Sequence, residues 1–387
     1  MQLITASSIH DGQKWMPSGT TLAVTDEGII IDILDTPTEH TIHYDGVLCP
    51  GFVNAHCHLE LSHMKGVVAE GTGLIPFLKN IPQYRNNYTT EQKQEARHIA
   101  FESMLRNGVV AVGDIANTDD TKDLRALGKM HFHTFVEALG FADSGTERSM
   151  GYAAATHASF AEQNSNIIQL QQSIVPHAPY SVSRSLFRLI SEQRPAAVIS
   201  IHNQESEEEN KYYNNKSGLV NDLLQSLKID DSSFVATGKP SLASYLPLIS
   251  ARHRLILVHN TYSNAQDVAF AVHYSDNVHW CLCPNANLYI ENRLPEIDML
   301  VKAGVNICVG TDSLASNYEL NVLGELLTIK KHYPTLSWET LLGWGTKNGA
   351  AALQLTDLVG AIEVGKKPGI LQLTHLDSSE PIVKRIA

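Results

Sequence analysis

Residues 50–60 of the chain read PGFVNAHCHLE, a Pro-Gly pair and a short apolar run that ends in two histidines one residue apart. Because alternate residues of a strand point to the same face, His56 and His58 project their imidazoles side by side. This arrangement offers two nitrogen ligands to one metal ion. A chain with 18 histidines among 387 residues contains about one such pair by chance, and a second pair occurs at His131 and His133. The surroundings of the first pair therefore decide its meaning.

The composition is that of a globular protein with a large core, since 43% of the residues are hydrophobic and 18% are charged. A formal net charge of −12 argues against a nucleic-acid-binding surface, which needs a basic patch. No apolar run is long enough to span a membrane, and the N-terminus lacks the features of a signal peptide. The five cysteines form neither a disulfide framework nor a Cys-x-x-Cys zinc site, so we expect a reducing compartment, the cytoplasm.

Strand-like runs alternate with helical patterns through the middle of the chain. Eight such runs begin or lie near residues 52–57, 109–114, 134–137, 174–177, 197–202, 255–259, 278–283 and 305–312. Eight strands separated by helices predict an α/β protein of the (β/α)₈ TIM-barrel type. A doubly wound parallel sheet is the alternative.

Both ends of the chain are rich in strand-like sequence. Residues 21–24 and 29–34 flank the turn sequence Asp26-Glu27-Gly28, and residues 370–373 follow a second turn at 365–369. We expect the two ends to pair in one small sheet, with two unrelated terminal hairpins as the alternative. The predicted domains are a β-domain of residues 1–50 plus 355–387 and a barrel of residues 51–354.

Polar residues stand at the ends of seven of the eight predicted strands: His56 and His58, Asp114, Glu137, His177, His202, His259 and Asp312. Active sites of such barrels lie where the strands end, so we expect these groups to converge on one mouth. His131 and His133 instead begin a strand, at the opposite face, which predicts a structural role.

Four of these side chains, His56, His58, His202 and Asp312, make a set of three nitrogens and one oxygen. That set suits a catalytic Zn²⁺ or another borderline divalent metal. Each residue alone is common in a structural role, and only their joint placement favours a metal site. Asp312 is predicted to hold the nucleophile as well as the metal, and His259 to orient it or, alternatively, to hold a second metal.

Glu205 follows His202 by three residues, so its carboxylate can reach an activated water without being a ligand. We therefore predict that Glu205 is the proton shuttle. The alternative is that Glu205 only begins the acidic run of residues 207–209, which we interpret as a solvated helix start favoured by the helix dipole.

Several motifs together resemble the amidohydrolase superfamily, in its cytosine/adenosine-type deaminase and chlorohydrolase branch. They are residues 50–58, HAPYS at 177–181, HNQE at 202–205, VHN at 258–260, CPNANL at 283–288, GTDS at 310–313 and GAIEVGKK at 360–367. The likeness implies a distorted (β/α)₈ barrel with a small β-sandwich built from both termini. It also implies one divalent metal per chain, Zn²⁺ or alternatively Fe²⁺, held by His56, His58, His202 and Asp312, with Glu205 and His259 in catalysis.

The resemblance also implies which further residues belong to the site. It implies substrate contacts by His177, Glu60, Asn285 and Ser313, although Asn285 stands in a segment where the branch usually has a Ser before the Asn. Binuclear members bridge two metals with a carboxylated lysine near the end of strand 4. No lysine occurs between Lys129 and Lys211, so we expect a mononuclear site.

The predicted function is hydrolytic deamination of an aminated purine or nucleoside-like substrate of the aminodeoxyfutalosine, S-adenosylhomocysteine or adenosine type. The alternatives are hydrolysis of another carbon-nitrogen or carbon-halide bond, as in chlorohydrolases, amidases or guanine and cytosine deaminases, and a non-catalytic relative. The expected partner is a small heterocyclic substrate rather than a nucleic acid or membrane, and the family likeness favours a homodimer. Residues 71–88 are expected to form either a mobile cover or a packed surface helix.

Overall fold

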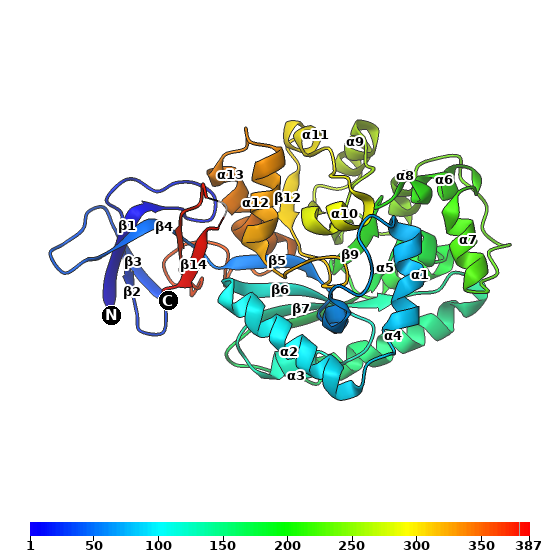
Figure 1. Ribbon diagram of the computed structural model, residues 1–387, viewed down its shortest axis with the longest axis horizontal. Helices are drawn as coiled ribbons and strands as arrows, with labels where there is room; N and C mark the ends of the chain where they lie inside the picture. Colours follow the sequence, from blue (N-terminus) through cyan, green and yellow to red (C-terminus); the bar gives the residue numbers. More distant parts are fainter. Residues whose placement is uncertain (379) are drawn as a thin grey trace.

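The computed structural model describes residues 1–378 and 380–387 and shows an α/β fold with parallel sheets (Figure 1). All eight predicted strands are present: β5 (Phe52–Cys57), β6 (Val109–Ala116), β7 (His131–Ala138), β8 (Leu170–Pro176), β9 (Val198–Asn203), β10 (Arg254–His259), β11 (Val278–Leu282) and β12 (Asn306–Val309). They are nearly continuous buried runs, as is typical of parallel strands covered on both faces.

The eight strands form two four-stranded parallel sheets, β5-β6-β7-β8 and β9-β10-β11-β12. Neighbours within each sheet are consecutive in the sequence, without the order reversal of a doubly wound sheet. Hydrogen bonds link the sheets on both sides. The His202 amide donates to the His177 carbonyl (3.0 Å), and the amides of Thr311 and Asp312 donate to the His56 carbonyl (2.9 and 3.1 Å). These links bring the first and last strands together at the predicted site.

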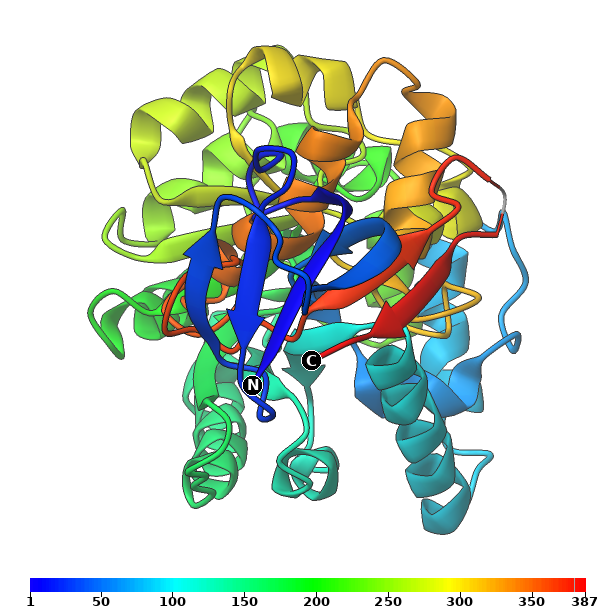
Figure 2. The ribbon, with the colours of Figure 1, turned by 90° about the vertical axis from the view of Figure 1, so that its left-hand side faces the viewer.

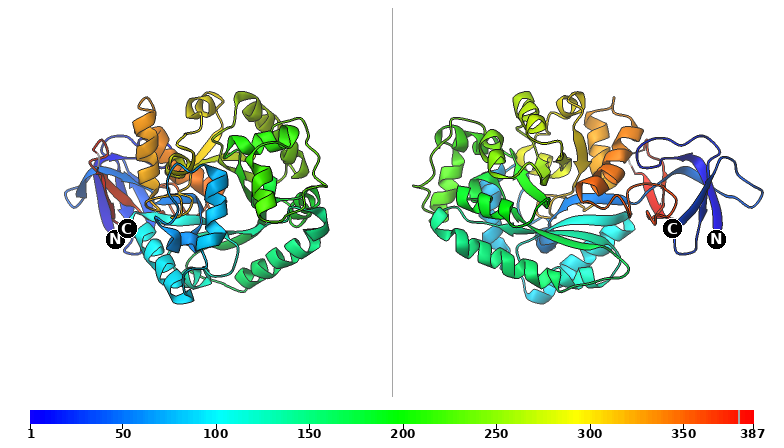
Figure 3. Two further views of the ribbon diagram at one scale, coloured as in Figure 1. Left: turned by 45° about the vertical axis from the view of Figure 1, so that its right-hand side comes forward. Right: turned by 180° about the vertical axis from the view of Figure 1, so that it is seen from behind.

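Helices lie outside the parallel sheets, as two further views show (Figure 3). They are α1 (Leu74–Tyr84), α2 (Thr90–Arg106), α3 (Lys122–Ala126), α4 (Thr146–Ala161), α5 (Arg184–Glu192), α6 (Glu207–Asn215), α7 (Leu219–Ser226), α8 (Ser241–Tyr245), α9 (Ala265–Tyr274), α10 (Pro284–Glu291), α11 (Ile297–Lys302), α12 (Val322–His332), α13 (Trp338–Gly343) and α14 (Gly349–Ala352). Short helical turns complete the set: η1 (Leu59–Met64), η2 (Asp143–Gly145), η3 (Pro179–Ser181), η4 (Leu246–Leu248) and η5 (Trp344–Asn348). None of the helices in the described residues is long and apolar enough to cross a membrane.

Helix α2 shows how local sequence sets these boundaries. Thr89 and Gln92 form a reciprocal capping box at its start, which satisfies two backbone N–H groups that the helix leaves free. Gly108 follows its end with φ of +82°, a conformation that glycine adopts without strain. Local sequence therefore sets both ends of α2.

Both chain ends contribute to one six-stranded sheet in the order β14-β13-β4-β1-β2-β3, which lies to one side of the α/β body (Figures 1 and 2). Its strands are β1 (Gln2–Ile9), β2 (Thr21–Val24), β3 (Ile30–Leu34), β4 (Ile42–Cys49), β13 (Leu371–Thr374) and β14 (Ile382–Arg385). β13 pairs antiparallel with β4. The prediction that the two ends pair is confirmed.

Strand β4 leads through Pro50 and Gly51 directly into β5, so the terminal sheet and the site share one continuous segment. Gly51 is required by close packing, because a Cβ there would lie 2.3 Å from a methyl carbon of Val110 and 2.9 Å from the Pro368 carbonyl oxygen. The Pro-Gly pair thus lets the chain pass between the terminal sheet and the strand that carries the two histidines.

Candidate active site

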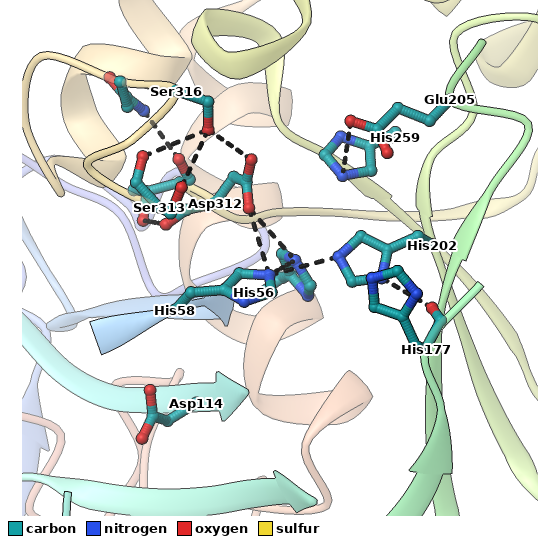
Figure 4. Close-up of polar contacts among 12 residues, drawn as sticks. His56, His58, Asp114, His177, His202, Glu205, His259, Asp312, Ser313 and Ser316 are labelled. Atoms are coloured by element: carbon teal, nitrogen blue, oxygen red, sulfur yellow. Dashed lines mark hydrogen bonds and ion pairs between the residues drawn. The ribbon is translucent and has the colours of Figure 1, made fainter. Parts of the chain in front are cut away.

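The carboxyl ends of the parallel strands surround a cavity of about 210 Å³. Nine of the residues predicted from the sequence line it: His58, Glu60, Glu137, His177, His202, Glu205, His259, Asp312 and Ser313. His56 lies fully buried beneath them, with its ring against those of His58 and His202 (Figure 4). The structure therefore brings most of the predicted strand-end groups to one place.

Three imidazoles and one carboxylate meet at the base of the cavity (Figure 4). His58 Nε2 lies 3.2 Å from His56 Nε2, 3.2 Å from His202 Nε2 and 3.3 Å from Asp312 Oδ1. Two ligands of one tetrahedral Zn²⁺, each about 2.05 Å from the ion, are about 3.3 Å apart. A ring nitrogen carries at most one hydrogen and cannot donate to two other nitrogens, whereas a shared cation accepts lone pairs from all three. The four predicted side chains fit a divalent metal.

The tautomer of His202 is set by its surroundings. Its Nδ1–H donates to the His177 carbonyl at 2.7 Å, which leaves a lone pair on Nε2 toward His58. Burial lowers the pKa of His202 to about 4 and the pKa of His58 well below the ordinary value. Both imidazoles are therefore neutral near pH 7, as metal ligation requires.

Asp312 is held by its backbone and by a serine. Its φ of +57° is in the left-handed region, a strained conformation of the kind that clusters at functional sites. The Ser316 hydroxyl donates to Asp312 Oδ2 at 2.6 Å, so Oδ1 remains free to face the histidines (Figure 4). Burial by itself raises the pKa of Asp312, but interactions with His56 and His58 outweigh it and hold this pKa well below its usual range. Asp312 is ionised.

His259 ends β10, also with a left-handed backbone at φ of +73°. The Asn287 side-chain amide donates to His259 Nδ1 at 3.2 Å, which places the His259 hydrogen on Nε2. That Nε2 lies 3.6 Å from Glu205 Oε1, and one donor atom of His259 falls within 4.8 Å of those of His56, His202 and Asp312. His259 thus presents an N–H donor to the centre of the site.

Glu205 lies beyond the end of β9, in the turn before α6, where only 5% of its surface is exposed. Burial, followed by the negative charge of Asp312, raises the pKa of Glu205 well above its ordinary value. A carboxyl group with a raised pKa that lies beside the ligand cluster is suited to take up and give back a proton in general acid–base work.

The acidic run after Glu205 is only partly the solvated helix start that the sequence predicts. Ser206 caps α6, and Glu207 is exposed. Glu209, in contrast, is fully buried, and its Oε1 accepts hydrogen bonds from the Gln204 amide and the Ser241 hydroxyl. The prediction is wrong for Glu209, because one turn into α6 its position faces inward, under the loop that carries Glu205.

Besides the buried His56, two further residues predicted to belong to the site do not line the cavity. Strand β6 continues two residues beyond Asp114, and the Asp114 carboxylate lies apart from the histidine cluster (Figure 4). It is buried beside β5, where it accepts a hydrogen bond from the Leu59 amide at 3.1 Å. Asn285 is bonded to the Glu325 carboxylate and the Thr328 hydroxyl instead of lining the cavity. These placements correct the expectations that Asp114 reaches the mouth and that Asn285 contacts substrate.

Asn117 lines the cavity and was not predicted from the sequence. Asn117 is the first residue after β6. It would have been identified if the end of this strand had been predicted at Ala116 instead of Asp114. The pair His131 and His133 is found at the start of β7, where His133 bonds to Gln171 and Ser173, away from the cavity.

The outer part of the cavity is apolar. Helix α1 begins after Gly73 and lies over the opening, and it contributes Leu74, Phe77, Leu78 and Ile81 to the lining. Further apolar side chains come from the loop after β7 and from the region of α7, namely Leu139, Phe141, Leu223 and Leu227. Leu74, Ile75 and Phe77 are buried, so α1 is packed against the body in this structure. Of the two expectations for residues 71–88, this agrees with the packed surface helix.

The sequence model of the amidohydrolase family matches residues 47–383. The chain belongs to this family. The resemblance deduced from the motifs is thereby confirmed, and the match includes every candidate ligand of the cluster.

Individual family members are similar over most of their length. Adenosine deaminase of Helicobacter pylori is 28% identical over 334 residues, which cover 84% of this chain and 78% of that protein. The crystal structure of H. pylori aminofutalosine deaminase in complex with methylthio-coformycin has a TM-score of 0.80 at 23% identity, covering 96% of this chain and 92% of that one. An adenosine deaminase from Xanthomonas campestris, solved with bound zinc, has a TM-score of 0.74 at 23% identity, covering 98% and 86%.

Proposed function

We propose that this amidohydrolase is a metal-dependent hydrolytic deaminase that releases ammonia from an aminated purine or nucleoside-like substrate. The observation that carries the proposal is the meeting, in one cavity, of the cluster His56, His58, His202 and Asp312 with the buried carboxyl group of Glu205. The similar proteins that are named as adenosine and aminofutalosine deaminases support this choice of reaction.

We further propose that β5 to β12 close into a distorted (β/α)₈ barrel of residues 51–354, with residues 1–50 and 355–387 as a β-sandwich domain. The hydrogen bonds between the residues after β12 and β5, and between those after β8 and β9, support closure. The isolated bridge between Cys57 and Asp312 lies at the first of these positions.

In the proposed mechanism, His56, His58, His202 and Asp312 hold one divalent metal, Zn²⁺ in preference to Fe²⁺. The metal, when bound, supplies a positive charge that lowers the pKa of a water molecule toward neutrality. Glu205 accepts a proton from the attacking water and delivers it to the ring nitrogen beside the carbon under attack.

The remaining residues orient the reactants. His259 Nε2–H donates to the attacking oxygen as negative charge develops on that oxygen. Asp312 accepts a hydrogen bond from the attacking water. The second proton of the water passes from the attached oxygen to the amino group, which then leaves as ammonia while the oxygen stays on the carbon as a carbonyl. The apolar outer cavity supports a flat heterocycle with an apolar portion, and His177, Glu60 and Ser313 are proposed to contact it.

The proposed setting is the cytoplasm, with the chain as a homodimer that binds a small heterocyclic substrate and neither nucleic acid nor membrane. Five buried free cysteines suit a reducing compartment. The net charge of −12 supports the absence of a nucleic-acid partner.

Two measurements test the proposed function. Elemental analysis of the purified protein is expected to find about one transition metal per chain, and a folded native protein without metal would refute the mechanism. A screen for ammonia release with adenosine, S-adenosylhomocysteine, aminodeoxyfutalosine, guanine and cytosine is expected to give at least one substrate. Release of chloride or acid from other compounds, with no ammonia from this panel, would assign the chain to a different hydrolytic reaction.

A further inference from the structure

One wall of the cavity is built from residues that take no part in the proposed metal binding and proton transfer. Glu60 lies in η1 after β5, Asn117 follows β6, and Glu137 is the second-last residue of β7. All three line the cavity beside His58 and His202. We refer to Glu60, Asn117 and Glu137 as the acceptor wall.

The N–H donors of Asn117 are all used within the acceptor wall. The Asn117 backbone amide donates to Glu60 Oε2 at 2.9 Å. Its side-chain amide donates one hydrogen to Glu60 Oε1 at 3.0 Å and the other to Glu137 Oε2 at 2.9 Å. Since an amide nitrogen of asparagine carries two hydrogens, every donor of Asn117 is used within the wall.

Glu137 keeps one oxygen without a hydrogen-bond partner in the described part of the chain. Its Oε1 is buried, and the whole residue is only 7% exposed. The nearest cationic candidate is His202 Nδ1 at 3.6 Å, but that nitrogen gives its hydrogen to the His177 carbonyl at 2.7 Å. A buried carboxylate oxygen without a donor is unfavourable, and Glu137 lines the cavity, where a bound molecule can supply that donor.

The charge of the wall restricts what can bind. Two carboxylates are present within it, and Arg85, at the end of α1, is the one arginine or lysine among the described residues that line the cavity. An anionic group beside Glu60 and Glu137 would be repelled in this low-dielectric setting, whereas N–H and O–H groups would be attracted.

We propose that the acceptor wall is a subsite that binds N–H or O–H donors of the substrate, with Glu137 Oε1 as the vacant acceptor. This inference rests on the proposed function, and it adds which kind of chemical group the substrate presents to the acceptor wall. The donors are either hydroxyl groups of a sugar or an amino group on the heterocycle, beyond the one that leaves. A substrate that places a carboxylate or phosphate at this wall is excluded.

The substitution Glu137→Gln tests the proposal with little change of shape. The glutamine carbonyl can still accept the Asn117 hydrogen, while its NH₂ group replaces Oε1 and turns the vacant acceptor into a donor. Glu162→Gln, on an exposed glutamate, is the matched control. Both are made in the Glu205→Gln protein loaded with metal, so that binding is measured by calorimetry without turnover.

Three probes distinguish the sources of the donor: adenosine, 2′,3′-dideoxyadenosine and 2,6-diaminopurine riboside. If sugar hydroxyls bind the wall, Glu137→Gln weakens adenosine binding about 10- to 100-fold and leaves dideoxyadenosine nearly unchanged. If a ring amino group binds it, the diaminopurine riboside binds more tightly than adenosine, and Glu137→Gln removes that advantage. The control is expected to match its parent for every probe.

Other results would overturn the inference. An equal change in the affinity for all three probes in Glu137→Gln, or no change for any of them, would show that Glu137 does not bind N–H or O–H donors of the substrate. A loss of metal from the Glu137→Gln protein would instead assign Glu137 to the orientation of His202. Binding of none of the probes to any of the proteins would refute the proposed function, and this inference with it.

Discussion

Replacement of Glu205 by glutamine is the sharpest test of the proposed chemistry. The side chain keeps its size and its buried place beside His259, but the carboxyl group that moves the proton is gone. Glu205 is separate from the four proposed ligands, so metal content is expected to stay near one ion per chain. General acid–base groups contribute about 10²- to 10⁴-fold to rate, which corresponds to about 3–5 kcal/mol of barrier.

The assay is steady-state ammonia release on the best substrate of the screen, with metal content measured on the same samples. We expect kcat to fall by about two to four orders of magnitude while the melting temperature does not fall. Glu207→Gln is the control, because Glu207 is exposed and its one ion pair among the described residues is with Lys211, which also contacts Glu208. Surface pairs of this kind contribute little. A Glu205→Gln enzyme with nearly full activity would refute the reasoning, as would loss of metal from this variant.

Three further predictions follow from the surroundings of the site. Ser316→Ala removes the hydroxyl that donates to Asp312 Oδ2 and is expected to weaken metal binding about 10- to 100-fold, as measured by competition with a chelator. Gly310→Ala places a Cβ 2.8 Å from both the Cβ and the carbonyl oxygen of His56, and we expect loss of metal together with a lower melting temperature. Burial raises the pKa of Glu325 to about 8, so its proton stabilises the folded state. The free energy of unfolding should then fall by about 1.4 kcal/mol per pH unit from this group between pH 5 and 8, and Glu325→Gln should flatten that slope in denaturant titrations.

The sign of the pH effect follows from proton binding. A glutamate titrates near its ordinary pKa in the unfolded chain and near 8 in the folded chain, so between these values the folded state binds more protons. Stability is therefore greatest on the acidic side of this window, and an unchanged slope in Glu325→Gln would contradict the assignment. For Gly310→Ala the control is Gly324→Ala in helix α12, where the nearest neighbour of a new Cβ is 3.5 Å away. Unaltered metal content in Gly310→Ala would refute the packing argument.

Much of the site was predictable because it obeys local rules. The alternation of side chains along a strand put His56 and His58 on one face, and the end of each parallel strand marked His202, His259 and Asp312. These residues depend on strand direction and periodicity, which a sequence pattern carries.

The errors fall where a boundary or a helix face had to be known within two residues. Asp114 was placed at a strand end, but β6 runs on to Ala116, and Asn117 takes the position in the cavity. Glu209 was read as solvated, yet its place on α6 turns it inward, where burial raises its pKa to about 8. The substrate contact of Asn285 was inferred from a family motif, but hydrogen bonds with Glu325 and Thr328 of α12 hold its side chain outside the cavity.

The sequence by itself determined the alternation of strands and helices and predicted the metal-ligand set and the proton shuttle, since each of these depends on residue type and spacing along the chain. Only the tertiary structure decided which atoms face one another. It paired β13 with β4 across more than 300 residues, oriented His202 through the His177 carbonyl and left Glu137 Oε1 without a donor from the part of the chain that the structure describes. Such contacts join residues that are distant in the chain, so their geometry depends on how the whole fold packs.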